Sequence, residues 1–169
     1  MTEREIHSQI VRWCELVTGL NTIKSHSNKK RPSGEYLMVN FLTGPADVRQ
    51  FVADIEYEDT GIPNSEGNNE INAIPVIESE WKFSISSYRG DDPMRPIRLL
   101  RSRSKIQGPQ QGIDPLLNIH DMGIPNNVPE LINNRWEKRA HVMIYVRAYT
   151  RDGFLIDVID EVPVTYQRI

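Results

Sequence analysis

The sequence contains a single cysteine, Cys14, among its 169 residues. An internal disulfide is therefore excluded, and the chain suits a reducing assembly compartment or one whose redox state does not matter. It also lacks an apolar run of about 18 residues and a charged-then-apolar leader, so we expect neither a membrane span nor a secretory signal. These absences predict a protein made in the cytoplasm and used there, or in something assembled there.

An excess of positive charge is missing too. Lys and Arg number 20 against 23 Asp and Glu, a formal net charge of -3, so no global basicity argues for nucleic-acid binding. The length fits a single domain over residues 1–169, long enough to bury roughly two-thirds of its unfolded surface. Within it, Asp59 to Asn72 is rich in Gly, Pro, Asn and Glu, which predicts a flexible loop.

Catalytic and ligand-binding motifs are also lacking. No phosphate loop, zinc cluster or hydrolase elbow is present. No two of the four histidines have metal-ligand spacing: His7, His26, His120 and His141. Cys14 lies beside an apolar helical stripe and is better explained as a small buried hydrophobe than as a nucleophile. We therefore assign no catalytic, metal or cofactor residue and expect a protein that is not an enzyme.

One stretch nevertheless has the spacing of a restriction-type nuclease site. Glu80 and Lys82, with Glu70 or Asp59 upstream, would share one face of a strand, where they could hold a metal ion and orient a water. Exposed strand faces commonly alternate Glu and Lys as cross-strand salt bridges, so we favour that simpler interpretation. A metal-dependent nuclease stays open as an alternative function.

Two helices are predicted. The first has apolar residues at helical spacing (Ile6, Ile10, Trp13 and Val17), with a capping box from Thr2 to Glu5 and a C-cap at Gly19. The second begins at Asp91 or Asp92, with Pro93 at its first position and Met94, Ile97 and Leu100 facing inward. Its solvent side carries cations only: Arg95, Arg98, Arg101, Arg103 and Lys105.

This basic helix face has three possible roles. It can simply be solvated, it can pair with acidic segments of a neighbouring subunit such as residues 54–59, or it can contact DNA phosphates. We favour solvation or subunit contact, because charge runs are most often surface. A small DNA-binding adaptor that uses the segment from Arg95 to Lys105 is the second alternative function.

Several strands are predicted from alternating apolar residues. They cover residues 36–42, 46–57 with Phe51, Ala53, Ile55 and Tyr57 on one side, 76–88 with Trp81, Phe83 and Ile85 inward, and 118–122. A loop or helical turn is expected near Val128 to Ile132. From Ala140 to Tyr149 the alternation buries Val142, Ile144 and Val146.

Asp152-Gly153 follows that last strand and suits a type I′ turn, with residues 154–159 running back. The element order predicts an α+β fold: a mostly antiparallel sheet with helices packed on one face and a long C-terminal β-hairpin.

The residues that lead into this strand carry a family resemblance. Asn134-Arg135-Trp136-Glu137-Lys138-Arg139-Ala140 has the form Arg-Trp-Glu-x-Arg-Ala, and it resembles the tail terminators, a family of neck proteins of contractile-tailed phages. The order of helix, short segment, Asn28-Lys29-Lys30-Arg31-Pro32 and strand is similar to the start of that family. Members usually carry Arg-Pro-x-x-Pro-Tyr there, whereas this chain has Arg31-Pro32-Ser33-Gly34-Glu35-Tyr36 and lacks the extended geometry of the second proline.

The resemblance implies a structural virion protein of the tail and neck, assembled in the host cytoplasm without a cofactor or a membrane. Such a protein closes the tail tube as a ring of six subunits and joins the tail to the head-side connector. The implied partners are further copies of the chain, the tail tube protein, the tail sheath protein and the head-to-tail connector protein, with genomic DNA passing through the lumen. We expect the contacts with subunits or neck proteins to involve Arg31, Pro32, Arg98, Arg101, Trp136 and Arg139.

Overall fold

The computed structural model describes the chain except residues 28–29, 49–53, 64–68, 107–112, 133 and 157–169. The chain divides into two compact units. The first comprises Met1–Gln50 and Glu78–Thr150, and the second comprises Phe51–Ile77 and Arg151–Ile169. Strand β4 (Asn69–Tyr88) contributes residues to both units. Among the described residues, no helix is both long enough and apolar enough to cross a membrane.

The first helix, α1 (Glu3–Thr18), has the predicted caps. Thr2 N–H donates to Glu5 Oε2 over 2.8 Å, and Glu5 N–H donates back to Thr2 Oγ1 over 3.4 Å. Gly19, at φ 70°, ends the helix by donating its N–H to the Glu15 carbonyl. The side chains at helical spacing that this helix buries completely are Ile6, Ile10, Trp13 and Cys14.

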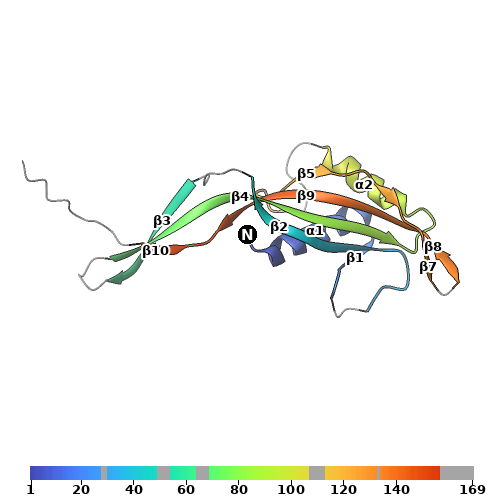
Figure 1. Ribbon diagram of the computed structural model, residues 1–169, viewed down its shortest axis with the longest axis horizontal. Coiled ribbons are helices and arrows are strands. Elements are labelled where there is room, and N and C mark those ends of the chain that lie inside the picture. The colour runs from blue at the N-terminus through green and yellow to red at the C-terminus, as the bar shows by residue number, and fades with distance from the viewer. Residues whose placement is uncertain (28–29, 49–53, 64–68, 107–112, 133, 157–169) are drawn as a thin grey trace, which may run out of the picture. The chain divides into compact units, whose positions relative to one another are not determined.

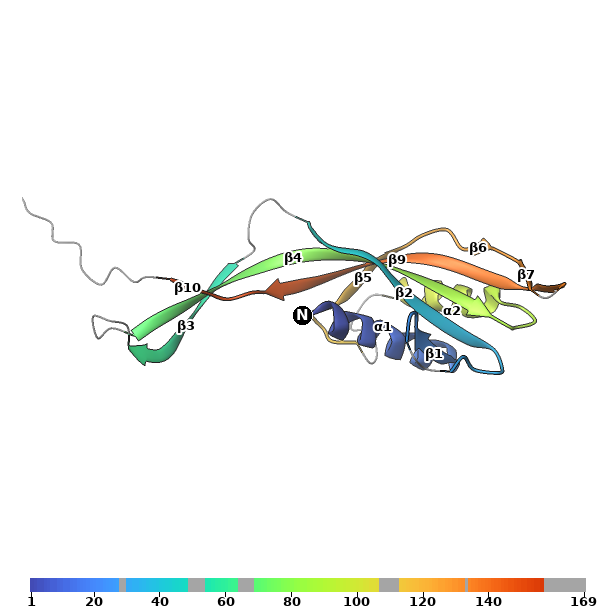
Figure 2. The same ribbon diagram turned by 60° about the horizontal axis from the view of Figure 1, so that its bottom comes forward.

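Those side chains pack against a mixed sheet. Its order is β1 (Asn21–Lys24), β2 (Tyr36–Asp47), β4, β9 (Arg139–Arg151) and β5 (Asn118–Met122), and the short β6 (Asn126–Asn127) also pairs with β9. The β1–β2 pair is parallel, while β2–β4 and β5–β9 are antiparallel. Figures 1 and 2 show α1 and α2 (Met94–Ser104) on the same face of this sheet. The predicted α+β class is confirmed.

The core lies between this face and the helices. It contains the residues predicted from alternation on two strands: Trp81, Phe83 and Ile85 on β4, and Val142, Ile144 and Val146 on β9. Ile97 and Leu100 of α2 are fully buried beside them. This helix begins at Met94, slightly later than predicted, with Pro93 at the N-cap position. Asp92 lies at the start of the helix, where its carbonyl accepts from Arg95 N–H over 3.0 Å. The Asp92 carboxylate accepts a hydrogen bond from Arg98 Nη2 over 2.7 Å, and this bond, with bonds from the first backbone N–H groups of the helix, lowers the pKa of Asp92.

The expected hairpin turn at Asp152-Gly153 is wrong. Strand β10 (Phe154–Ile156) pairs antiparallel with β4, whereas β9 lies beside β4 itself and is not the partner of β10. Neither turn residue has the positive φ that a type I′ turn requires, although the structure describes both. A glycine at position 153 instead allows a close approach to β4, because a Cβ there would lie 2.6 Å from the Asn72 side chain. The hairpin in this third of the chain is shorter and earlier, between β7 (Glu130–Ile132) and β8 (Arg135–Glu137).

Strand β7 also replaces the loop or helical turn expected from Val128 to Ile132. The sequence of β7 has only short apolar runs and no periodic pattern that would predict a strand. We therefore attribute this strand to its pairing with β8.

The second unit is a ribbon of β3 (Asp54–Pro63), the Asn69–Ile77 part of β4, and β10. Of the strand expected over residues 46–57, residues 46–47 end β2 and residues 54–57 begin β3. Phe51 and Ala53 lie outside the described residues. Ile55 and Tyr57 were expected inside but are 41% and 63% exposed.

Most of the loop expected from Asp59 to Asn72 belongs to strands. Asp59–Pro63 continues β3 and Asn69–Asn72 opens β4, while 64–68 lies outside the described residues. Polar side chains support this pairing: Thr60 Oγ1 donates to the Glu70 carbonyl over 3.0 Å, and Asn69 Nδ2 donates to Asp59 Oδ2 over 2.9 Å. Residues that favour turns in isolation therefore act here as cross-strand partners.

Candidate functional site

Glu80 and Lys82, the residues of the nuclease alternative, lie on the sheet face opposite the helices. Glu80 Oε2 lies 2.7 Å from His120 Nε2 on β5 and 3.6 Å from Arg147 Nε on β9. Lys82 Nζ sits over the Tyr145 ring, 5.4 Å from its centroid. These contacts form a cross-strand ladder, the simpler interpretation of the Glu-x-Lys spacing. The described residues contain no cluster of three His, Cys, Asp or Glu side chains that could hold a metal ion.

The β7–β8 hairpin presents a different kind of surface. Its turn includes Asn134 at φ 61°, a conformation that asparagine tolerates better than most residues. Leu131 on β7 pairs directly with Trp136 on β8, and both stay largely exposed at 53% and 69%. Ile132 beside them is 37% exposed. Exposed tryptophan and aliphatic side chains on one short hairpin indicate a contact surface.

Arg139, the first residue of β9, holds this hairpin to the sheet. Its guanidinium forms ion pairs with Glu130 on β7 and with Glu137 on β8, where Nε and Nη2 both donate to Glu137 Oε2 over 2.8 and 2.6 Å. The same guanidinium lies over the Tyr88 ring of β4 at 4.8 Å. Because the Arg139 and Glu137 side chains are only 18% and 20% exposed, that ion pair is largely shielded from water, whereas Glu130 is 55% exposed.

A second layer of contacts fixes the neighbouring strands. Tyr36 on β2 stacks on Tyr88 with centroids 4.9 Å apart and planes 8° from parallel, as their direct pairing in the β2–β4 register dictates. Burial raises the pKa of Tyr36. Arg89 follows Tyr88; it lies over the Tyr36 ring at 5.7 Å, pairs with Glu137 at 3.5 Å and donates to the Pro32 carbonyl.

Together these elements border a surface groove of about 590 Å³, lined by Arg31, Tyr36, Arg89, Ile132, Arg135, Trp136, Glu137 and Arg139. The structure thus brings together Arg31, Trp136 and Arg139, three of the contact residues expected from the sequence, with Pro32 next in the chain to Arg31. We call Arg31, Leu131, Ile132, Arg135 and Trp136 the Trp136 surface. Sequence reasoning missed Arg89, Tyr36 and Tyr88, whose proximity depends on the register between distant strands.

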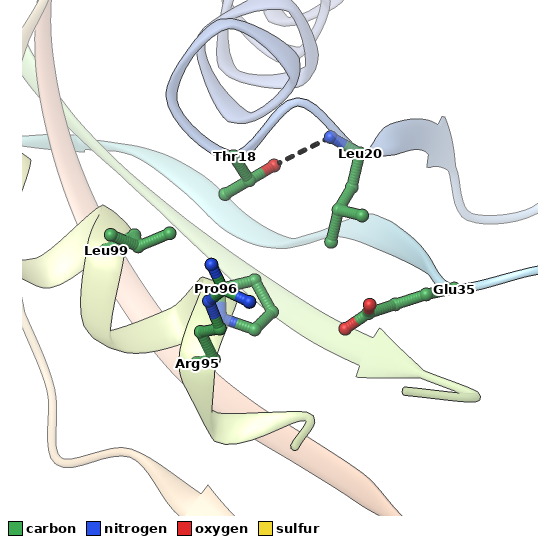
Figure 3. Close-up of a pocket in the computed structure, with 6 residues that line it drawn as sticks. All are labelled: Thr18, Leu20, Glu35, Arg95, Pro96 and Leu99. Atoms are coloured by element: carbon green, nitrogen blue, oxygen red, sulfur yellow. Dashed lines mark hydrogen bonds between the residues drawn. The ribbon is translucent and has the colours of Figure 1, made fainter. Parts of the chain in front are cut away.

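Arg98 and Arg101 do not line this groove; they lie on the exposed side of α2. Arg95 and Leu99 of the same helix border a small hollow with Thr18, Leu20, Glu35 and Pro96 (Figure 3). Leu20 N–H donates to Thr18 Oγ1 over 3.2 Å at its rim. The hollow holds about 160 Å³, which is smaller than the ~300–1,000 Å³ of typical small-molecule sites. The α2 face therefore resembles a protein-contact or solvated surface more than a ligand pocket.

Comparison with known proteins identifies one family. Residues 4–168 match the family described as "Phage neck terminator protein". No curated protein sequence is significantly similar to the chain.

Proposed function

The chain belongs to the phage neck terminator protein family, and we propose that it caps the end of the tail tube as a ring of identical subunits and joins the tail to the head-side connector. The observation that carries this proposal is the extent of the family match, because residues 4–168 include nearly all of both units. The chain is thus a virion protein of the tail and neck, and its family points to a structural role instead of an enzymatic one.

The proposed mechanism is stoichiometric. Identical subunits that contact one another through two different surfaces form a closed ring when the rotation between them closes. Such a ring ends tube growth because its far face no longer copies the surface that a tube subunit presents. We propose six subunits, the tail tube, tail sheath and connector proteins as partners, and passage of genomic DNA through the lumen, following the resemblance of the sequence to tail terminators.

The contacts we propose fall on two surfaces. Arg31, Pro32, Trp136 and Arg139 lie at the groove beside the β7–β8 hairpin, while Arg98 and Arg101 lie on the exposed side of α2. The combination of exposed tryptophan, aliphatic residues and arginine is typical of the centre of protein interfaces, from which other charged residues are depleted. This composition supports protein contact at the Trp136 surface over simple solvation.

We further propose that the chain acts as one domain, because the single strand β4 contributes residues to both units. No specific observation favours either alternative function, the metal-dependent nuclease or the DNA-binding adaptor. Glu80 is engaged by His120, and the cations of α2 lie beside an exposed Leu99, which suits a protein partner as well as a phosphate backbone.

The mass of the purified protein in solution tests the proposal. We expect a closed assembly of six copies of the 19.5 kDa chain by native mass spectrometry, and rings by negative-stain microscopy. Reversing Arg98→Glu and Arg101→Glu should leave the circular dichroism spectrum unchanged and weaken the ring or its docking, because rim charges tune association more than folding.

Two results would contradict the proposal. If the protein stays monomeric at all concentrations and does not bind tube ends, the proposed ring is refuted. Magnesium- or manganese-dependent DNA cleavage that is lost in the Glu80→Ala, Lys82→Ala variant would establish the nuclease instead. Rings and normal virions from the Arg98→Glu, Arg101→Glu variant would show that this part of α2 is only solvated.

A further inference from the structure

We propose that strand β3 of one copy docks onto the Trp136 surface of a second copy, so that the second unit is the arm that links neighbouring subunits. This inference rests on the proposed ring and specifies which two surfaces form its repeating contact.

The described part of the second unit has almost no core of its own. Of the side chains described there, only Val76 is buried. Along β3, every residue except Thr60 is exposed, including the large apolar side chains Ile55, Tyr57 and Ile62 at 41%, 63% and 59%. Ribbons of two or three strands are marginal in water unless they cover a hydrophobic face. Packing against another molecule would provide that cover.

Strand β3 also presents an open edge. Among the described residues it pairs with β4 alone, so its other side is a free strand edge. Three backbone N–H groups of β3, those of Ile55, Gly61 and Ile62, already donate to side chains of the same strand. Side chains from both faces of a strand border its edge, which brings the acidic and the apolar residues of β3 within reach of one docking surface.

The charge of β3 is of one sign. It contains Asp54, Glu56, Glu58 and Asp59 and no cation. Glu56 is paired with Arg151 at 3.2 Å, and Asp59 accepts hydrogen bonds from Gly61 and Asn69. Asp54 and Glu58 have no ion-pair partner within the described part of the chain. Two carboxylates are thus left to attract cations of another molecule.

The Trp136 surface complements β3 both in charge and in its exposed apolar side chains. Arg31 and Arg135 are exposed and form no ion pair with any described residue, whereas Arg89 and Arg139 are engaged by Glu137. Between them lie exposed apolar side chains, Leu131, Ile132 and Trp136, which match Ile55 and Tyr57 of β3. A contact of this kind combines a Trp–Tyr–aliphatic centre with peripheral ion pairs, the usual anatomy of a specific interface.

A second copy of the chain is the occupant that fits best. Each copy carries both halves, the acidic strand and the Arg–Trp surface, so the contact is heterologous and repeats from subunit to subunit. A ring then closes through repeats of this one contact, and no additional protein is needed to join the subunits.

Charge reversal and its compensation test the docking. An arm-reversed variant, Asp54→Lys with Glu58→Lys, should form rings at least roughly tenfold less readily than the wild type, measured as the protein concentration for half-assembly by light scattering. A surface-reversed variant, Arg31→Glu with Arg135→Glu, should show the same defect. Combining all four substitutions in one chain should restore assembly, because attraction is then re-established with its signs exchanged. Circular dichroism confirms that each variant is folded.

The matched control reverses the other basic surface. Combining the arm-reversed variant with Arg98→Glu and Arg101→Glu changes the charge equally but should not restore assembly. Restoration by this control alone, or by neither combination, would overturn docking at the Trp136 surface. Normal rings from the arm-reversed variant would overturn the role of β3 while leaving the ring itself intact. A wild-type protein that forms no assembly would instead contradict the proposed function together with this inference.

A cross-link provides a second readout that does not depend on charge. Tyr57→Cys with Leu131→Cys should give interchain disulfides and a ladder of multiples on a denaturing gel after mild oxidation, since Cys14 is buried. The control pair Tyr57→Cys with Leu99→Cys should remain largely uncross-linked. Equal cross-linking of the two pairs would contradict the docking.

Discussion

Arg139 is the residue whose removal tests the account of the hairpin most sharply. In the Arg139→Met variant the aliphatic stem is kept, but the guanidinium that joins Glu130 and Glu137 to the Tyr88 ring is lost. Because Glu130 and Glu137 are direct cross-strand partners, two carboxylates then face each other, and only Arg89, which pairs with Glu137 at 3.5 Å, still offsets their charge. We therefore expect the β7–β8 hairpin to detach or fray.

The magnitude follows from how exposed these groups are. Hydrogen bonds to charged groups contribute ~1.5–3 kcal/mol, and breaking a fully buried ion pair costs about 3–5 kcal/mol. The Arg139 and Glu137 side chains are 18% and 20% exposed, but Glu130 is 55% exposed, so solvent screens part of the loss. We expect the free energy of unfolding to fall by about 2–3 kcal/mol, a decrease in Tm of roughly 5–10 °C for a chain of this size.

Urea unfolding followed by circular dichroism measures this change. Arg98→Met is the matched control, because it removes an Arg–Asp pair whose side chains are 59% and 52% exposed and should cost less than about 1 kcal/mol. Adding Glu137→Gln to Arg139→Met should recover about 1 kcal/mol by relieving the facing carboxylates. If Arg139→Met costs no more than Arg98→Met, the anchoring role of Arg139 is refuted.

Three further predictions concern the core. His7 donates from Nε2 to the Val39 carbonyl over 3.1 Å, and burial lowers the pKa of His7. The unfolded chain therefore binds this proton at a higher pH than the folded chain does, so the free energy of unfolding should fall as the pH drops below about 6.5. The His7→Gln variant should show a smaller fall between pH 7.5 and 5.5, and the remaining fall is due to His141, whose pKa burial also lowers. Burial raises the pKa of the Cys14 thiol, so a thiol reagent at pH 8 should label the protein only as fast as it unfolds; labelling of the native protein at the rate of a free thiol would show that α1 is not packed as described. Val142→Ala removes a completely buried side chain and should cost about 2 kcal/mol in urea unfolding, whereas Met143→Ala on the opposite strand face, where Met143 is 37% exposed, should cost less than about 1 kcal/mol; equal effects would contradict the assigned face of β9.

Periodic segments were predictable from the sequence, because the residues that specify them are local. The stripe of α1 and the alternation on β4 and β9 each place apolar side chains on one face, and Trp13, Phe83 and Ile144 are all completely buried. The segments that were mispredicted depend on distant partners. Gly153 can mark either a turn or a close approach, and only its position against Asn72 decides between them.

The same distinction applies to the candidate site. The run from Asn134 to Ala140 drew attention to Trp136 and Arg139 through its resemblance to a family, but no local pattern connects it with Tyr36 or Arg31. These residues meet because β2 pairs with β4 at Tyr36–Tyr88 and Arg139 reaches Tyr88. The exposure of Ile55 and Tyr57 was likewise unpredictable, since alternation indicates which side chains share a face but not whether anything covers that face.

Tube capping is the most direct test of whether this protein ends the growth of the tail tube. Purified tail tubes are mixed with the protein, imaged by negative-stain microscopy, and then supplied with free tube subunits. We expect a ring at one end of each tube and no further elongation from that end, while the folded Arg31→Glu, Arg135→Glu variant should leave ends uncapped and growing. Tubes that elongate equally with and without the wild-type protein, and that carry no ring at either end, would contradict a role in tail termination.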